Sequence, residues 1–275
     1  FYALFYLEKI LKVDGADANI LVAIALVLGT PFFVLFGWLS DRIGRKYIIL
    51  GGCALAALTY FPAFHALSDA ANPALGRASL SAPVTVTASA DECSFQFDPI
   101  GKNKFDSSSC DIAKAYLAKN GIDYRNVAAP AGTVASVSVG GTVLTAPDPA
   151  AVTGEARAAA ITAYQDQVKA YLGAAGYPAK ADPAAMNKPL VVAILFYLVL
   201  LVTMVYGPIA AMLVELFPSR IRYTSMSLPY HIGNGWFGGF LPTTAFAMVT
   251  ASGDISYGLW SPVVVVAVLV VGGGL

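Results

Sequence analysis

Long stretches without a charged residue constrain the fold of this chain more than any other feature. No Asp, Glu, Lys or Arg occurs in five ranges, which are 18–40, 47–67, 189–214, 223–253 and 255–275. A helix needs about 20 apolar residues to cross the hydrocarbon core of a bilayer, which is about 30 Å thick. The first four ranges meet that length, the fifth stops with the chain, and residues 1–7 are typical of the end of another span. We therefore predict an all-α transmembrane helical bundle embedded in a lipid bilayer.

The charge content excludes several other classes of protein. Charged residues make up 12% of the chain and the formal net charge is zero, whereas an ordinary soluble domain has about 25% charged residues. A nucleic-acid-binding protein would need a basic excess. A large soluble protein with buried helices is the alternative, but such helices are usually shorter and have a charged face. A single signal peptide cannot explain five such ranges.

The charges that are present indicate an inserted domain. Residues 68–188 hold 21 of the 34 charged residues. We expect this range to be a small α+β soluble domain between two spans. Residues 1–67 are then the end of one span plus two full spans, and residues 189–275 are two full spans plus a truncated last span. Because the chain begins at Phe1 rather than Met and stops inside an apolar range, we expect a fragment of a longer protein.

Local patterns predict the elements of the insertion. Apolar and polar residues alternate in 83–88 and 134–139, which is typical of strands. Gly140-Gly141 then predicts a hairpin into the next strand. Ser108 followed by Asp111 resembles a capping box at the start of a helix, and a second helix is expected at about 154–172. The predicted apolar stripe of that second helix is Ile161, Tyr164, Val168 and Tyr171.

Two of the three cysteines lie in the insertion. Cys93 and Cys110 can form a disulfide in an oxidising compartment, where it would contribute about 3 kcal/mol. The alternative is two free thiols. Cys53 lies within a predicted span and is expected to be an ordinary packed side chain.

The insertion has no recognisable catalytic or metal-binding group. It contains no histidine, and its acids are interspersed with lysines as on a solvated surface. The spacing of an EF-hand is absent. We expect no enzyme activity, no metal and no cofactor. A membrane-embedded enzyme would need a nucleophile with a base, or a metal cluster, and the sequence has neither.

Basic residues in short loops predict the orientation in the membrane. The loop 41–46 has three basic residues and the loop 215–222 has two, whereas 8–17 and 252–258 have more acid than base. The positive-inside rule places the two basic loops in the cytoplasm. The insertion 68–188 then lies outside a bacterial-type inner (plasma) membrane, in the periplasm.

The string GWLSDRIGRK at 37–46 has the most specific pattern in the chain. Glycine allows close helix approach or a tight turn, and an acid beside a basic cluster can hold two helix bundles together in one conformation and release them in another. The alternative is a positively charged anchor with no moving part. The candidate gating residues are Gly37, Asp41, Arg42, Gly44, Arg45 and Lys46.

This string resembles the loop signature of the major facilitator superfamily, in which a Gly and three residues precede Asp-Arg-x-Gly-Arg-Lys. The string ELFPSRIRYTSMSLPYHIGNGWFGGFLP at 215–242 is similar to the penultimate span region of its metabolite–proton symporter branch. The resemblance covers roughly 1–67 and 189–275 and implies the C-terminal half of a transporter. Its members carry organic acids or zwitterionic osmolytes with a proton, and the N-terminal half would be the missing partner. An insertion between the ninth and tenth spans departs from the compact family pattern.

The second basic loop supplies further gating candidates, namely Glu215, Arg220 and Arg222. Glu215 is positioned to pair with Arg45 or with Arg222. The alternative is a local surface ion pair, which contributes little to stability.

Polar residues inside a span are functional candidates because lipid offers them no hydrogen-bond partner. At helical spacing, Ser227, His231 and Asn234 share a face that is expected to line a substrate cavity. A histidine held by hydrogen bonds between helices is the alternative. The full set of cavity candidates is Ser227, Tyr230, His231, Asn234, Trp236 and Tyr206.

These observations favour a secondary active transporter, in which two bundles rock to alternate access to a central site. The resemblance implies proton-coupled symport of a small organic acid or zwitterionic metabolite. The alternative is a membrane-anchored binding or sensor module in which the 68–188 domain is the functional part. No acid lies within the predicted spans, so a carboxylate that carries the proton would belong to the missing half.

Overall fold

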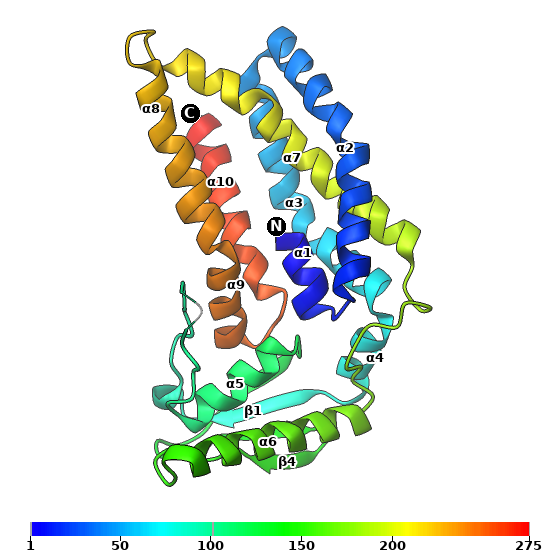
Figure 1. Cartoon of the computed structure of the whole chain (residues 1–275), viewed down its shortest axis with the longest axis vertical. Helices are drawn as coiled ribbons and strands as arrows, with labels where there is room; N and C mark the ends of the chain where they lie inside the picture. Colours follow the sequence, from blue (N-terminus) through cyan, green and yellow to red (C-terminus); the bar gives the residue numbers. More distant parts are fainter. Residues whose placement is uncertain (1, 101, 275) are drawn as a thin grey trace.

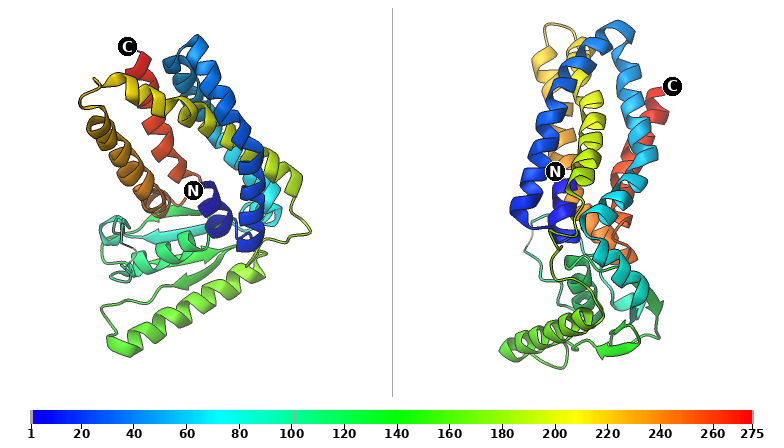
Figure 2. Two further views of the ribbon diagram at one scale, coloured as in Figure 1. Left: turned by 45° about the horizontal axis from the view of Figure 1, so that its top comes forward. Right: turned by 90° about the vertical axis from the view of Figure 1, so that its right-hand side faces the viewer.

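The computed structural model describes residues 2–100 and 102–274. Long helices run roughly side by side along the molecule, and a small sheet with its own helices closes one end of them (Figures 1 and 2). We refer to residues 72–187, which contain the sheet, as the sheet unit. The chain is therefore mostly helical, and the sheet is confined to one end.

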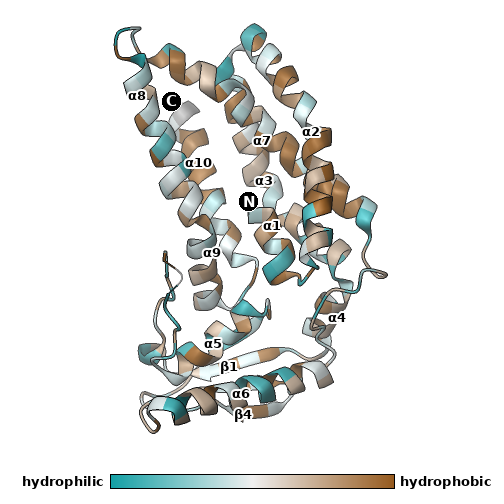
Figure 3. Ribbon diagram, viewed as in Figure 1, coloured by the Kyte–Doolittle hydropathy of each residue, from teal (hydrophilic) through white to brown (hydrophobic). Residues whose placement is uncertain are grey.

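Three helices of the described chain are long and apolar enough to cross a membrane. They are α2 (Gly15–Ile43), α3 (Arg45–Ala71) and α7 (Lys188–Leu216). Hydrophobic residues cover much of α2 and α7 (Figure 3). Val27 is 71% exposed and Leu58 is 75% exposed. Apolar side chains so exposed in the middle of long helices need a lipid or protein surface around them.

Glycines let α2 and α3 pack closely on α7, which lies between them. A side chain at Gly29 would collide with Val199 of α7, and a Cβ at Gly52 would lie 2.9 Å from the Cβ of Met204. Thr59 and Tyr197 also share a hydrogen bond of 2.8 Å between α3 and α7. In a low-dielectric environment such close packing and interhelical hydrogen bonding replace the hydrophobic effect as the source of helix association.

The remaining apolar ranges form shorter, interrupted helices. Range 223–253 is divided into α8 (Arg222–His231), a π-helix η3 (Ile232–Gly238) and α9 (Gly239–Ser252), which follow one another along one rod (Figure 1). After a 3-10 turn, η4 (Tyr257–Leu259), the chain enters α10 (Trp260–Gly274). The first residues form α1 (Tyr2–Phe5) and a π-helix η1 (Tyr6–Ile10). The sequence did not predict either π-helix.

The sheet unit contains four strands in the order β2-β1-β3-β4. Strand β1 (Val84–Ala88) is parallel to β2 (Tyr124–Ala128) and antiparallel to β3 (Ser136–Val139). The turn at Gly140-Gly141 joins β3 to β4 (Thr142–Thr145), as predicted. The helices of the unit are α4 (Pro73–Ser81), the 3-10 turn η2 (Ala90–Glu92), α5 (Ser109–Lys119) and α6 (Gly154–Ala174).

The structure agrees with most of the local predictions for this unit. Ser108 caps α5, because its hydroxyl accepts a hydrogen bond of 3.0 Å from the backbone N–H of Asp111. Helix α6 begins at Gly154, as predicted, but its buried face uses Leu172 in place of the predicted Tyr171, which is exposed. Strand β2 was not predicted, because its residues after Tyr124 are exposed and show no alternation.

Candidate functional site

A single residue, Gly44, joins α2 to α3 at the end of the helices opposite the sheet unit (Figure 1). Its φ is +99°, a left-handed value that glycine adopts without strain. A Cβ there would also lie 3.2 Å from the ring of Tyr47. The predicted tight turn is therefore present, and it brings the side chain of Arg45 next to that of Asp41.

Arg45 bridges two carboxylates from different helices. Its Nη2 lies 3.1 Å from Oδ1 of Asp41 at the end of α2, and its Nη1 forms an ion pair with Glu215 in the last turn of α7. The Arg45 side chain is 21% exposed, whereas Asp41 and Glu215 are 63% and 65% exposed. The structure thus pairs Glu215 with Arg45 rather than with Arg222. We refer to this three-residue contact as the Arg45 bridge.

The other predicted gating cations do not join this bridge. The guanidinium carbon of Arg42 lies 4.0 Å from the centre of the Trp38 ring, a cation–π contact within α2. Arg222 Nε donates to the carbonyl of Phe217 at 3.2 Å. Lys46 and Arg220 are exposed. The basic cluster therefore divides into one bridging residue and four cations with local or solvent-facing positions.

The close helix approach predicted at Gly37 depends on a different glycine. A Cβ on Gly37 would meet nothing within 4 Å. A Cβ on Gly207 of α7, however, would lie 3.2 Å from the carbonyl oxygen of Phe33 and 3.3 Å from the backbone nitrogen of Gly37. Beside Gly37, the missing side chain that lets α2 and α7 approach is therefore that of Gly207, and Gly37 contributes only backbone.

Two of the predicted cavity residues meet directly. The hydroxyl of Tyr206 on α7 donates to Oδ1 of Asn234 in η3 at 2.7 Å. Both residues are exposed in this chain. A π-helix inserts an extra residue into the helical path, and such segments are frequent at functional sites. Asn234 lies in this π-helix, and its side chain reaches α7.

The other four cavity candidates lie along the same rod without joining that contact. The rings of Tyr230 and His231 meet edge to face at a centroid distance of 5.9 Å. Trp236 contacts the ring of Phe240 at 6.4 Å, and Ser227 is half-buried. Ser227, His231 and Asn234 follow one another along α8 and η3, and their shared face toward a cavity stays a prediction.

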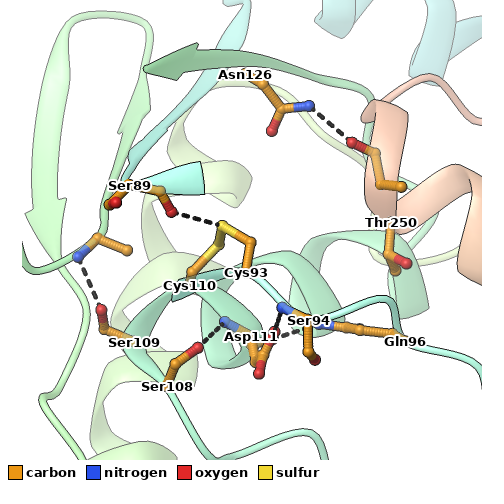
Figure 4. Close-up of a disulfide and its surroundings, with 12 residues drawn as sticks. Ser89, Cys93, Ser94, Gln96, Ser108, Ser109, Cys110, Asp111, Asn126 and Thr250 are labelled. Atoms are coloured by element: carbon orange, nitrogen blue, oxygen red, sulfur yellow. Dashed lines mark hydrogen bonds between the residues drawn. A yellow bond between two sulfur atoms is a disulfide. The ribbon is translucent and has the colours of Figure 1, made fainter. Parts of the chain in front are cut away.

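The predicted disulfide is confirmed. Cys93 and Cys110 are bonded, with 5.3 Å between their Cα atoms (Figure 4). The adjacent Asp111 is buried, and its carboxylate accepts hydrogen bonds from Ser94 N at 2.8 Å and Ser107 Oγ at 2.9 Å. Disulfide and carboxylate together attach the segment after β1 to the start of α5.

Sequence reasoning missed the junction between β2 and the α9–α10 turn. Asp123 Oδ1 accepts from Ile255 N at 2.7 Å, and Tyr124 N donates to Gly253 O at 2.8 Å. The Tyr124 hydroxyl donates to Thr250 O at 2.6 Å. The Asn126 amide donates to backbone carbonyls at the end of α9, next to Thr250 (Figure 4). The contact is between backbone and side chains more than 120 residues apart, so no local pattern marks it. We refer to this set of contacts as the β2 junction.

Burial raises the pKa of the Asp123 carboxyl to about 6, and the nearby negative charge of Asp254 adds to the effect. The hydrogen bond from Ile255 and the proximity of His65 oppose this rise. The carboxyl therefore changes protonation near neutral pH at a point where two parts of the chain meet. Among the described residues, no group of three or more His, Cys, Asp or Glu side chains is placed to hold a metal ion.

Comparison with known proteins adds a short region of similarity. No family model and no solved structure matches the chain. Proteins named "Putative proline/betaine transporter" from Staphylococcus aureus strains COL, MSSA476 and N315 are 32% identical over 66 residues. Over this stretch the chain is similar to a transporter. The match covers 23% of this chain and 14% of the length of each relative.

Proposed function

We propose that the chain is part of a secondary active transporter that moves a small organic acid or zwitterionic metabolite by alternating access. The observation that carries this proposal is the Arg45 bridge, which ties the turn between two long apolar helices to the end of a third. A contact of this kind can close one end of a transport path in one conformation and open in another. The name of the similar Staphylococcus proteins supports the same class.

The polar contact between Tyr206 and Asn234 supports a path between α7 and η3. Two hydrogen-bonding side chains inside predicted spans are costly unless they face a cavity or each other. Helical interruptions beside a substrate site are a recurring feature of secondary transporters. We propose that these residues line the central path, with His231, Ser227 and Tyr230 on the same rod.

We propose further that the transporter is of the major facilitator type and that this chain supplies its C-terminal half. The Arg45 bridge would lie in the cytoplasm, and the 68–188 domain would lie outside the plasma membrane. The driving ion would be the proton, carried by a group in the missing half. These assignments rest on the loop signature and on the excess of basic residues in 41–46 and 215–222.

The test is uptake by the complete protein reconstituted in vesicles. Labelled proline and betaine are the first substrates to try, because they appear in the name of the similar proteins. An inward proton gradient is expected to drive accumulation, and an ionophore that dissipates the gradient is expected to abolish it. Absence of uptake for these and for a panel of organic acids would contradict transport.

The second candidate function is a membrane-anchored binding or sensor module. The observation in its favour is that the sheet unit has a disulfide and a four-stranded sheet of its own. Replacing the 68–188 domain by a short linker separates the two proposals. Retained uptake favours transport by the helices, whereas loss of ligand binding in a protein that never transports favours the sensor.

A further inference from the structure

A cavity of about 310 Å³ lies where α1, η1 and α9 meet the sheet unit. The helices contribute Tyr2, Phe5 and Phe246, and the sheet unit contributes Phe105 and the end of α5. This volume is at the small end of the range found for ligand sites, and a mainly apolar lining that includes aromatic side chains is typical of them. The cavity therefore suits a small molecule with an apolar body, and neither the helices nor the sheet unit forms it alone.

The charged residues at the cavity include more bases than acids. Lys9, Lys119 and Asp98 line it. Asp98 uses its carboxylate to shape its own loop, because Oδ1 accepts from Ile100 N at 3.1 Å and Oδ2 accepts from Asn103 N at 2.7 Å. Both lysines are exposed and come from different elements, Lys9 from η1 and Lys119 from the last turn of α5. Two ammonium groups against one engaged carboxylate favour an anionic ligand.

The backbone at Phe105 supports a ligand-binding role for this wall. Its φ is +49°, a left-handed value that is unfavourable for a bulky residue. Strained positions of this kind persist where the surrounding structure holds them, and they are concentrated at ligand sites. Here the strained residue is one of those that line the cavity.

We propose that this cavity binds a small monocarboxylate with an apolar body, placing the carboxylate near Lys9 and Lys119 and the body against the aromatic rings. The site lies at the end of the helices opposite the Arg45 bridge and is distinct from the Tyr206–Asn234 contact. This site deepens the proposed function, because it would be the first docking point for the substrate of a transporter. Only that role rests on the proposed function. Binding itself requires no transport.

The experiment is calorimetric titration of the complete protein, purified in detergent, with three probes of similar size, each a benzene ring with one small polar substituent. Benzoate carries the carboxylate, benzamide is neutral and benzylamine is cationic. Benzoate is expected to bind at least tenfold more tightly than either of the others. Lys9→Gln and Lys119→Gln are each expected to weaken benzoate binding about tenfold, since a hydrogen bond to a charged group is worth about that much.

Lys102→Gln is the matched control, because Lys102 is an exposed lysine of the same loop region that does not line the cavity. This variant is expected to bind benzoate as the wild type does. Equal binding of benzoate and benzamide, or unchanged benzoate affinity in a Lys9→Gln/Lys119→Gln double variant with normal thermal stability, would overturn the proposal. Uptake without benzoate binding would contradict this site but not the proposed transport. Benzoate binding without uptake would support this site and contradict the proposed transport.

Discussion

The carboxylate of Asp123 accepts a hydrogen bond of 2.7 Å from the backbone N–H of Ile255, across 132 positions of sequence. This contact attaches the sheet unit to the turn between α9 and α10. Tyr124 and Asn126 extend it with further hydrogen bonds to the end of α9. The sheet unit and the turn that joins the last two helices are thus held by a small polar patch that contains one titratable group of raised pKa.

The folded state is expected to lose stability as the pH rises, because burial disfavours the charged carboxylate of Asp123. The folded pKa of Asp123 is about 6, above the value of 3.8 for an unperturbed carboxyl. The stabilising effect of the protonated form is complete below about pH 4 and is lost as the pH rises through 6. Asp123→Asn keeps an acceptor for Ile255 without a charge, so this variant should match the wild type at pH 4 and exceed its stability at pH 7 by up to about 3 kcal/mol.

Thermal unfolding in detergent between pH 4 and 7.5 measures this difference. Asp148→Asn is the control, because Asp148 is an acid of the same unit that lies in an exposed loop away from the junction. Its difference from the wild type should not change with pH. Parallel pH profiles for Asp123→Asn and the wild type would contradict the assignment of a titrating group to the junction.

Gly207 and Gly37 should respond oppositely to the same substitution. A Cβ on Gly207 meets the backbone of α2 at 3.2–3.3 Å, and backbone cannot move aside without separating the helices. Gly207→Ala is therefore expected to lower the free energy of unfolding by about 1–3 kcal/mol, as overpacking does. Gly37→Ala has no neighbour within 4 Å and should be neutral or slightly stabilising. Equal losses in the two variants, measured by thermal unfolding, would show that the α2–α7 contact is not as described.

The contrast between these glycines shows what the sequence could predict. The uncharged ranges located α2, α3 and α7, because hydropathy is a sum over many residues and tolerates local error. The Gly140-Gly141 hairpin and the Ser108 cap were also predicted, because each depends on residues a few positions apart. The sequence could not show whether Gly37 or Gly207 permits the close contact between α2 and α7. That depends on how each helix is rotated about its own axis, and no local pattern records the rotation.

The candidate site was predictable to the same degree. Residues of the 37–46 string were found from their spacing, but the partner of Glu215 remained a choice between Arg45 and Arg222 until the helix ends were placed in space. The π-helix at 232–238 and the hydrogen bond that joins its Asn234 to Tyr206 had no local signal in the sequence. The β2 junction was missed altogether, because it joins residues more than 120 positions apart and no local pattern records such a contact.

The Cys93–Cys110 disulfide should stabilise the sheet unit. It closes a loop of 17 residues, for which a loss of about 3 kcal/mol is expected on removal. Cys93→Ser/Cys110→Ser should lower the unfolding temperature, and a reducing agent should lower that of the wild type by a similar amount. Cys53→Ala is the control, since this buried free thiol is not part of the bond. A wild type insensitive to reduction in the unfolding measurement would argue against this role.

Removal of the Tyr206 hydroxyl should affect transport more than folding. Tyr206→Phe leaves Asn234 without its donor in an exposed position, so the cost in stability should be small, whereas uptake by the reconstituted protein should fall about fivefold. Tyr197→Phe is the matched variant, because its hydroxyl joins α3 to α7 through Thr59. That variant should lose stability and keep most of its uptake. The reverse pattern would move the substrate path away from η3.

Asp41→Asn should cut uptake strongly while leaving membrane insertion intact. The substitution removes one of the two carboxylates that hold Arg45, and Arg45 then faces Glu215 alone. If the Arg45 bridge closes one end of the path, its weakening shifts the balance between open and closed conformations and slows the transport cycle.

Arg45→Gln and Glu215→Gln should act in the same direction, and their effects should be less than additive because they break one contact. Arg220→Gln, in the same loop but outside the bridge, should transport normally. Normal uptake by Asp41→Asn and Arg45→Gln, with expression equal to the wild type, would reduce the bridge to a surface ion pair of no functional consequence.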